Sequence, residues 1–395
     1  MSPITTTASC SRNLRAIAAP MPCAPPVTSA TLPESLPILV SPLRESPACR
    51  QPSCPHRQWN RARACRGSGG GVPYIRKNRA ARRGGEERAM KLGITTNYTW
   101  FGPPVTALAQ TIESLGFESM WMGEHPIIPV AAAEAERYGV PLPPNYRHMP
   151  ALFVSLSAAA AVTSKIRLGT NICLVPQRDP LLLAKEVATL DRISGGRVSF
   201  AYGTGWIEEE APVFGYRFDK RLGRTLDFMR AVQTLWAEGD QGYEGEHISF
   251  PPVHCYPKPL QKPLPVLIGS GNDKTDNTKI LRRVARTADG WLPSFLSPAQ
   301  MREQLSLLKE FCAEEGRDFA ALDISLIVPA ISFGVGDLPP WGAGAYDNLE
   351  PVNAKELVAE YAEAGVGRIL VGVNDMEDDG AFKALEDVAK GMGLL

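Results

Sequence analysis

From Met90 to Leu395 the sequence alternates short apolar runs with longer amphipathic segments, and this alternation restricts the fold more than any other feature. Repeated strand-then-helix patterns are typical of βα units around a parallel sheet. The expected strands are Leu92–Thr96, Ser119–Gly123, Ile166–Val175, Val198–Tyr202, Val266–Gly269, Gly290–Pro293, Asp323–Ile331 and Arg368–Val373. Eight such units in 306 residues predict an α/β fold, a (β/α)8 TIM barrel with insertions.

A doubly wound sheet is the alternative, but it needs a Gly-rich dinucleotide turn after its first strand, and Thr96–Thr99 provides none. Asp179 and Pro180 are an N-cap and a first-turn residue, and Gly116 is a C-terminal stop. The expected helices are Val105–Leu115, Pro150–Val162, Pro180–Ile193, Arg221–Trp236, Lys279–Thr287, Ala299–Glu315, Ala354–Ala364 and Ala381–Met392, with Tyr243–Pro265 as a hairpin or extended excursion.

Residues 1–89 differ from the rest in charge and composition. They carry 14 Lys and Arg against 4 Asp and Glu, whereas residues 90–395 carry 28 against 38. This segment is rich in Pro, Ser, Arg and Ala and keeps no helical or strand period, so we expect it to be disordered. Glu86-Glu87, a few residues before Met90, can be encoded as a purine-rich ribosome-binding site. Our hypothesis is that Met90 is the native start, with a targeting segment or an authentic tail as alternatives.

Several function classes are disfavoured. The sequence lacks His-x-His and His-Glu-x-x-His spacings, so we expect no metal site. No apolar run approaches the roughly 20 residues of a membrane-spanning helix. The three cysteines after Met90 are scattered, which favours a cytoplasmic location over a disulfide framework. Nucleic-acid binding would depend on the basic first segment alone, so we expect none.

The active site of such a barrel lies at the C-terminal ends of its strands. The polar and small residues expected there are Thr96, Asn97, Glu124, His125, Thr170, Asn171, Gly203–Gly205, Gly269–Gly271, Ser294, Ser332 and Asn374. Glu124 and His125 are the most informative, because imidazole titrates near neutrality and a carboxylate beside it tunes that titration. We expect an acid–base pair in which Glu124 holds the ring of His125; a structural histidine that caps the long loop is the alternative.

The run Gly269–Thr275 ends a strand and opens a helix. Its small residues let backbone N–H groups approach an anion, and Ser270, Lys274 and Thr275 add polar and charged groups. This pattern predicts a phosphate cradle that includes Gly271, although a tight βα turn has the same composition. Gly203 and Gly205 leave room for a flat ring, or serve only the turn.

Several further stretches make a family recognisable. Ile166–Thr170 followed by Pro180–Arg197, then Gly203–Glu210, Pro257–Pro259 and Ala288–Trp291, resemble the core of the luciferase-like monooxygenase superfamily in order along the chain. Trp121–Pro126, combined with Gly205-Trp206, resembles the branch that uses the deazaflavin coenzyme F420.

This resemblance implies that a cofactor ring lies in the barrel mouth, with its phosphate near the loop after the fifth strand. It implies a non-prolyl cis peptide at Asn171-Ile172 behind the ring, a catalytic role for His125, cofactor contacts that include Asn97 and Thr170, and a homodimer. Sugar-phosphate dehydrogenases of the superfamily have an acidic residue where this chain has Trp206, which argues against a sugar-phosphate substrate.

The leading hypothesis is an F420-dependent oxidoreductase that moves a hydride between the deazaflavin and a small organic substrate. The alternatives are an FMN-dependent monooxygenase that uses O2, and a barrel that binds the cofactor without turnover. The fold cannot distinguish among them.

Overall fold

The computed structural model describes residues 90–135, 142–271, 277–333, 354–373 and 379–395. All of them belong to one compact unit, which spans Tyr74–Leu395. The expectations for residues 1–89, including a native start at Met90, lie outside the described residues.

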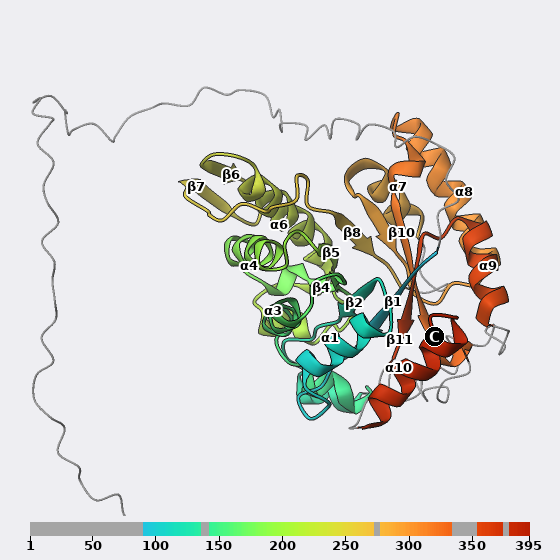
Figure 1. Cartoon of the computed structure of the whole chain (residues 1–395). Coiled ribbons are helices and arrows are strands. Elements are labelled where there is room, and N and C mark those ends of the chain that lie inside the picture. The colour runs from blue at the N-terminus through green and yellow to red at the C-terminus, as the bar shows by residue number, and fades with distance from the viewer. Residues whose placement is uncertain (1–89, 136–141, 272–276, 334–353, 374–378) are drawn as a thin grey trace, which may run out of the picture. The chain divides into compact units, whose positions relative to one another are not determined.

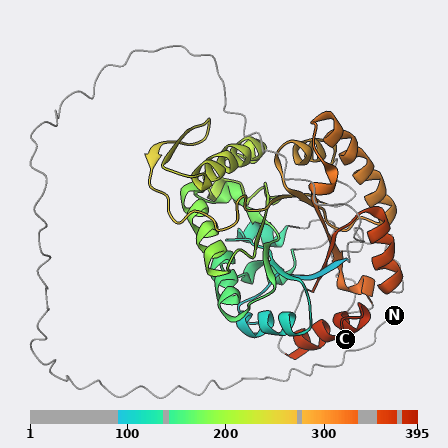
Figure 2. The same ribbon diagram turned by 45° about the horizontal axis from the view of Figure 1, so that its top comes forward.

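Eight parallel strands close into a barrel surrounded by helices, as predicted (Figure 1 and Figure 2). The barrel strands are β1 (Lys91–Thr96), β2 (Ser119–Met122), β3 (Arg167–Thr170), β5 (Val198–Gly203), β8 (Val266–Gly269), β9 (Gly290–Leu292), β10 (Asp323–Pro329) and β11 (Arg368–Gly372). Each pairs with the next, and β1 also pairs with β11, so that the first and last strands lie side by side. The join between β3 and β5 is short, with Leu168 paired to Val198 and Gly169 to Ser199.

The third predicted strand, Ile166–Val175, is interrupted. Strand β3 ends at Thr170, and a short strand, β4 (Cys173–Leu174), continues beside β5, with Cys173 opposite Tyr202. The break contains the Asn171-Ile172 peptide, which is cis, as the family resemblance implies.

Helices follow the strands close to the predicted bounds. The α-helices are α1 (Val105–Ser114), α2 (Val130–Glu134), α3 (Leu152–Val162), α4 (Pro180–Ile193), α5 (Glu210–Val213), α6 (Arg221–Trp236), α7 (Thr278–Thr287), α8 (Pro298–Glu314), α9 (Ala354–Ala364) and α10 (Asp379–Gly391); the 3-10 turns are η1 (Pro144–His148), η2 (Val175–Gln177), η3 (Phe218–Lys220), η4 (Phe319–Ala321) and η5 (Ala330–Phe333). Asp179 caps α4 by accepting bonds from two backbone amides, as its position predicts. The excursion after α6 is an antiparallel hairpin of β6 (Gln241–Glu244) and β7 (Ser249–Val253).

The barrel interior is filled by apolar side chains, so it is a core and not a pore. Its buried members are Trp121, Ala201, Leu267, Leu292, Ile327 and Leu370. Trp121 is accommodated by a glycine on the next strand, because a Cβ at Gly169 would stand 2.0 Å from the indole. Ile172 and Phe295 pack on this layer.

An ion cluster around the buried Arg368 joins strands at the opposite, N-terminal end of the barrel. The Arg368 guanidinium donates to Glu118, just before β2, at 2.9 Å, and to Asp323, the first residue of β10, at 2.7 Å. Burial alone would raise the pKa of Asp323, but the charge and hydrogen bonds of Arg368 outweigh it and lower that pKa. The pKa of Glu118 is lowered against burial in the same way. Three segments of the wall are therefore joined far from the strand ends where chemistry is expected.

Within the described ranges, no helix has the length and apolar content that a bilayer span requires.

Candidate active site

The C-terminal ends of β1, β2 and β3 converge as predicted. The carboxamide of Asn171 donates to the Thr95 hydroxyl at 2.7 Å. A Cβ at Gly123 would stand 2.8 Å from Oδ1 of Asn97 and 2.9 Å from the carbonyl oxygen of Asn171. The two asparagines therefore meet across a glycine that keeps the space between them open.

A second group of small residues surrounds Ile172. A Cβ at Gly203 would stand 2.0 Å from Cδ1 of Ile172, and a Cβ at Gly269 would stand 2.7 Å from its Cγ2. The ends of β5 and β8 thus receive the Ile172 side chain, which packs on the barrel interior. Gly205 has a φ of 78°, a backbone conformation that favours glycine. Gly203 and Gly269 therefore make room for the Ile172 side chain.

The predicted phosphate cradle is described only in part. The Ser270 hydroxyl accepts a hydrogen bond from the Trp291 indole at 3.1 Å, and Gly271 is exposed. Lys274 and Thr275 lie outside the described residues. The hydroxyl of Ser270 can still donate a hydrogen bond, so this residue suits an anion such as a phosphate oxygen.

Thr170 has a different role from the predicted one. Its hydroxyl donates to the carbonyl oxygen of Ala201 at 2.6 Å and accepts from the amide of the same residue at 2.8 Å. The side chain is fully buried and bridges β3 to β5 where their main-chain pairing has stopped. The hydroxyl therefore serves the barrel wall.

His125 has a carboxylate partner that the sequence did not predict. Its Nδ1 lies 2.6 Å from Oε1 of Glu210, and the other oxygen of Glu210 accepts from the Gln177 amide at 2.7 Å. Glu210 is fully buried and His125 nearly so. A carboxylate oxygen at this distance favours the imidazole tautomer with its proton on Nδ1, and Nε2 is not the atom that Glu210 engages.

Two aromatic rings flank His125. The ring of Tyr146, from η1, lies 5.0 Å from the imidazole, and the Trp206 ring lies 6.3 Å from it at nearly a right angle. Tyr146 and Trp206 are also edge-to-face, 6.2 Å apart. The loops after β2 and β5 thus give the imidazole aromatic walls, and the Trp206 ring is 40% exposed.

The expectation that Glu124 holds the ring of His125 is wrong. Glu124 accepts from the amide of Leu174 at 2.7 Å and from Nε of Arg178 at 3.0 Å, and its second oxygen pairs with Nη2 of the same arginine. Consecutive residues of an extended segment point to opposite sides, so neighbours in sequence do not share a partner. Glu124 instead anchors β4 and the segment before α4.

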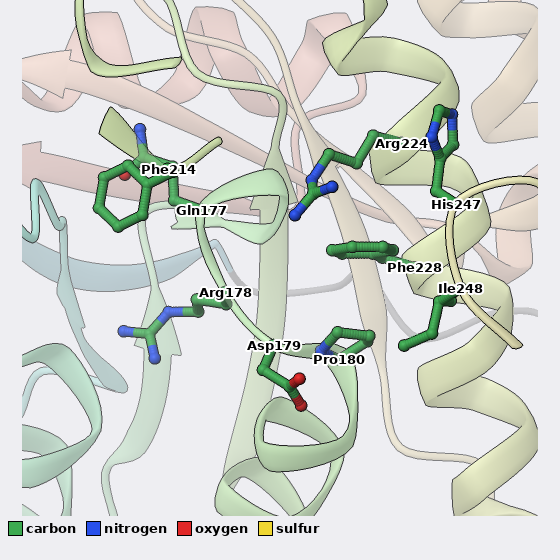
Figure 3. Close-up of a pocket in the computed structure, with 9 residues that line it drawn as sticks. All are labelled: Gln177, Arg178, Asp179, Pro180, Phe214, Arg224, Phe228, His247 and Ile248. Carbon is green, nitrogen blue, oxygen red and sulfur yellow. The ribbon is translucent and has the colours of Figure 1, made fainter. Parts of the chain in front are cut away.

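A surface pocket of about 370 Å³ lies beside this anchor (Figure 3). None of the predicted site residues lines it. Gln177 and Arg178 do line it, and these two side chains bind Glu210 and Glu124. The pocket therefore borders the groups that support the site, and in Figure 3 the Arg224 guanidinium points into the space between Gln177 and Phe228.

Glu210, Tyr146, Gln177 and Arg178 were missed because no local pattern marks them. Glu210 is the last of three consecutive glutamates, and burial alone separates it from the other two. Tyr146 lies in a Pro-rich loop. Within the described part of the chain, no three His, Cys, Asp or Glu side chains gather as a metal site would require.

Residues 103–333 match the family described as luciferase-like monooxygenase. An uncharacterised protein of Mycobacterium tuberculosis is 34% identical over 286 residues, which cover 72% of this chain and 92% of the relative. The chain belongs to the luciferase-like monooxygenase family.

Solved structures similar to this luciferase-like protein include enzymes with either cofactor. An F420-dependent secondary alcohol dehydrogenase, bound to an F420–acetone adduct, has a TM-score of 0.58 at 18% identity and covers 77% of this chain and 98% of its own. The FMN complex of a type II Baeyer–Villiger monooxygenase from Pseudomonas putida has a TM-score of 0.58 at 17% identity and covers 76% and 97%. At these identities the likeness shows the fold alone.

Proposed function

We propose that this protein is an oxidoreductase that uses coenzyme F420 and transfers a hydride between the deazaflavin and a small organic molecule. The observation that carries the proposal is the buried His125–Glu210 pair, 2.6 Å apart, in the segments that follow β2 and β5 at the strand ends. A buried imidazole with one nitrogen fixed by a carboxylate is suited to proton transfer at the other nitrogen.

The residues present fit a flat ring with a phosphate attached. Gly203 and Gly269 make room for the Ile172 side chain, so a flat ring would rest on Ile172 and on the backbone at 171–172. Asn97 and Asn171 offer amide groups at one edge, and Ser270 offers a hydroxyl at the other, with Lys274 and Thr275 as sequence-predicted phosphate contacts. When bound, the deazaflavin would supply a hydride donor or acceptor at its C5 carbon.

His125 supplies or takes the proton that accompanies the hydride. Glu210 holds Nδ1, which directs the exchangeable position to Nε2 and keeps the ring in one orientation. Gln177 in turn fixes Glu210. Tyr146 and Trp206 restrict access of water to the imidazole, which strengthens its hydrogen bond to the carboxylate.

The aromatic walls favour an uncharged, partly apolar substrate. Trp206 stands where sugar-phosphate dehydrogenases of the superfamily carry an acid, and its ring faces His125 edge-on. A phosphorylated sugar would lose hydration against these rings without gaining a charged partner from them.

Cofactor titration of the purified full-length protein tests the proposal. We expect F420 to bind and FMN to bind much more weakly. Tight FMN binding with no F420 affinity would replace the proposal with the FMN-dependent monooxygenase, in which the same histidine handles protons. Binding of either cofactor without turnover of alcohols, ketones or aldehydes would support the non-catalytic alternative. The homodimer implied by the family resemblance stays a prediction, which light scattering can test.

A further inference from the structure

A cavity of about 480 Å³ lies on the outside of the barrel, between α6 and α7, and is separate from the residues placed in the active site. Figure 1 shows these two helices on either side of β8. Its floor is apolar, with Tyr202 and Met229 buried and Leu226 partly buried. Its rim is basic: Arg230 comes from α6, and Lys279, Arg282, Arg283 and Arg286 come from α7. We call this cavity the α6–α7 groove.

The cations of the α6–α7 groove are not all neutralised by the protein. Arg282 and Arg286 pair with Glu314 and Glu315 of α8. Lys279 and Arg283 lie one turn apart on α7 and have no acidic partner among the described residues. Residues 90–395 carry ten more acidic than basic side chains, so a groove with unpaired positive charge stands out from the rest of the unit.

The groove begins where the predicted phosphate loop ends. Strand β8 ends at Gly269, and α7 begins at Thr278, immediately before Lys279. If this loop holds the phosphate of a cofactor, any group beyond that phosphate would lie near the first turns of α7. Lys279, Arg283 and Arg286 are spaced along that helix, over about 10 Å, so they can meet a chain with several negative charges.

We propose that the α6–α7 groove binds the acidic tail of the cofactor, and this rests on the proposed function. Coenzyme F420 carries a chain of γ-linked glutamates beyond its phosphodiester, whereas FMN ends at its phosphate. Lys279 and Arg283 pair with the tail carboxylates, and Leu226 and Met229 contact its methylene groups. The groove is therefore a specificity site that distinguishes the two cofactors at a distance from the ring.

Titration of the full-length protein with two forms of F420, one without glutamates and one with a chain of several, tests the groove. We expect the long-tailed form to bind more tightly at low ionic strength, with the difference shrinking as salt screens the charges. The double substitution Lys279→Glu and Arg283→Glu should weaken the long-tailed form about tenfold and leave the tail-less form unchanged. FMN affinity, however weak, should also be unchanged.

Arg302→Glu is the matched control, because Arg302 is an exposed cation of α8 outside the groove. It should preserve the difference between the two forms. Equal affinity for both forms would overturn the proposal that the groove binds the tail. So would a difference in affinity that remains in the double variant when its melting temperature is unchanged. Neither result would contradict F420 dependence. Failure of both forms to bind would overturn the proposed function, and the groove with it.

Discussion

Nδ1 of His125 lies 2.6 Å from Oε1 of Glu210, although 85 residues separate them in the chain. The pair joins the loop after β2 to the helix that follows β5, and Gln177 completes it from a third segment. If this arrangement transfers protons, its members act as a unit, and the effects of substituting them on the rate will not be additive.

His125→Asn preserves hydrogen-bonding capacity without a group that titrates near neutrality. We expect the rate of hydride transfer to fall by about 10²–10⁴-fold with cofactor affinity retained. Stopped-flow absorbance of the deazaflavin measures the rate, and its fluorescence measures binding. Full activity with an unaltered pH profile would mean that the histidine is structural.

Glu210→Gln tests whether the carboxylate acts through His125. The single variant should lose rate, but by no more than His125→Asn, and the double variant should be no slower than His125→Asn alone. Glu208→Gln, two residues earlier and exposed, is the control and should be near wild type. Additive losses in the double variant would show that Glu210 has an independent role.

Gly203→Ala should destabilise the barrel mouth, because the new Cβ would stand 2.0 Å from Cδ1 of Ile172. Overpacking of this kind costs about 1–3 kcal/mol, or several degrees in melting temperature. Ile172→Val removes Cδ1 and should recover most of the loss. The same Val should not rescue Gly269→Ala, whose closest contact is the Cγ2 atom that valine keeps. Equal rescue of both would contradict the packing described.

The ion cluster of Arg368 predicts that the free energy of unfolding decreases at acidic pH. Both Glu118 and Asp323 have lowered pKa values in the folded protein. Their contribution is therefore complete above the ordinary carboxylate pKa of about 4 and is lost as pH falls through the lowered values. Urea unfolding between pH 2 and pH 7 (a range of about five units) measures this loss.

Arg368→Met leaves two partly buried carboxylates without their cation and should lower the free energy of unfolding by about 3 kcal/mol near neutral pH. Burial would then raise both pKa values, so the acid-induced decrease in the free energy of unfolding should begin at a higher pH. Arg217→Met removes the cation of an exposed pair with Asp219 and should leave both the unfolding free energy and its pH dependence nearly unchanged. If the pH dependence of the free energy of unfolding is the same in Arg368→Met as in the wild type, this cluster is not its cause.

A chain that begins at Met90 should melt within about 4 °C of the full-length protein and keep its cofactor affinity. We propose this from the composition of residues 1–89, which lacks the apolar surface that cooperative packing needs. Differential scanning calorimetry of both chains gives the answer. A larger loss would mean that the first segment contributes to the fold.

The strands and helices were predictable because each apolar run is long enough to form one strand of the barrel wall. Each run is also followed by a segment whose apolar residues recur with the period of a helix. Val266–Gly269 and Arg221–Trp236 have the predicted bounds. The break after Thr170 was not predicted as a break in pairing, because the apolar run Ile172–Val175 continues the pattern of the same strand past Asn171 in the sequence. The site was harder, since Glu124 is next to His125 in sequence but binds Arg178, and Glu210 is far away but binds His125. Such partners depend on loop paths that no local pattern encodes.

Arg368, Glu118 and Asp323 fasten one end of the barrel, whereas His125 and its partners occupy loops at the other. Substitutions at the two ends are far enough apart to have independent energetic effects. Residues in the loops at the C-terminal strand ends, cofactor contacts included, can therefore be substituted without a compensating stabilisation of the N-terminal end of the barrel. The same fold occurs in proteins only 17% or 18% identical to this one, of which one holds an F420 adduct and the other FMN.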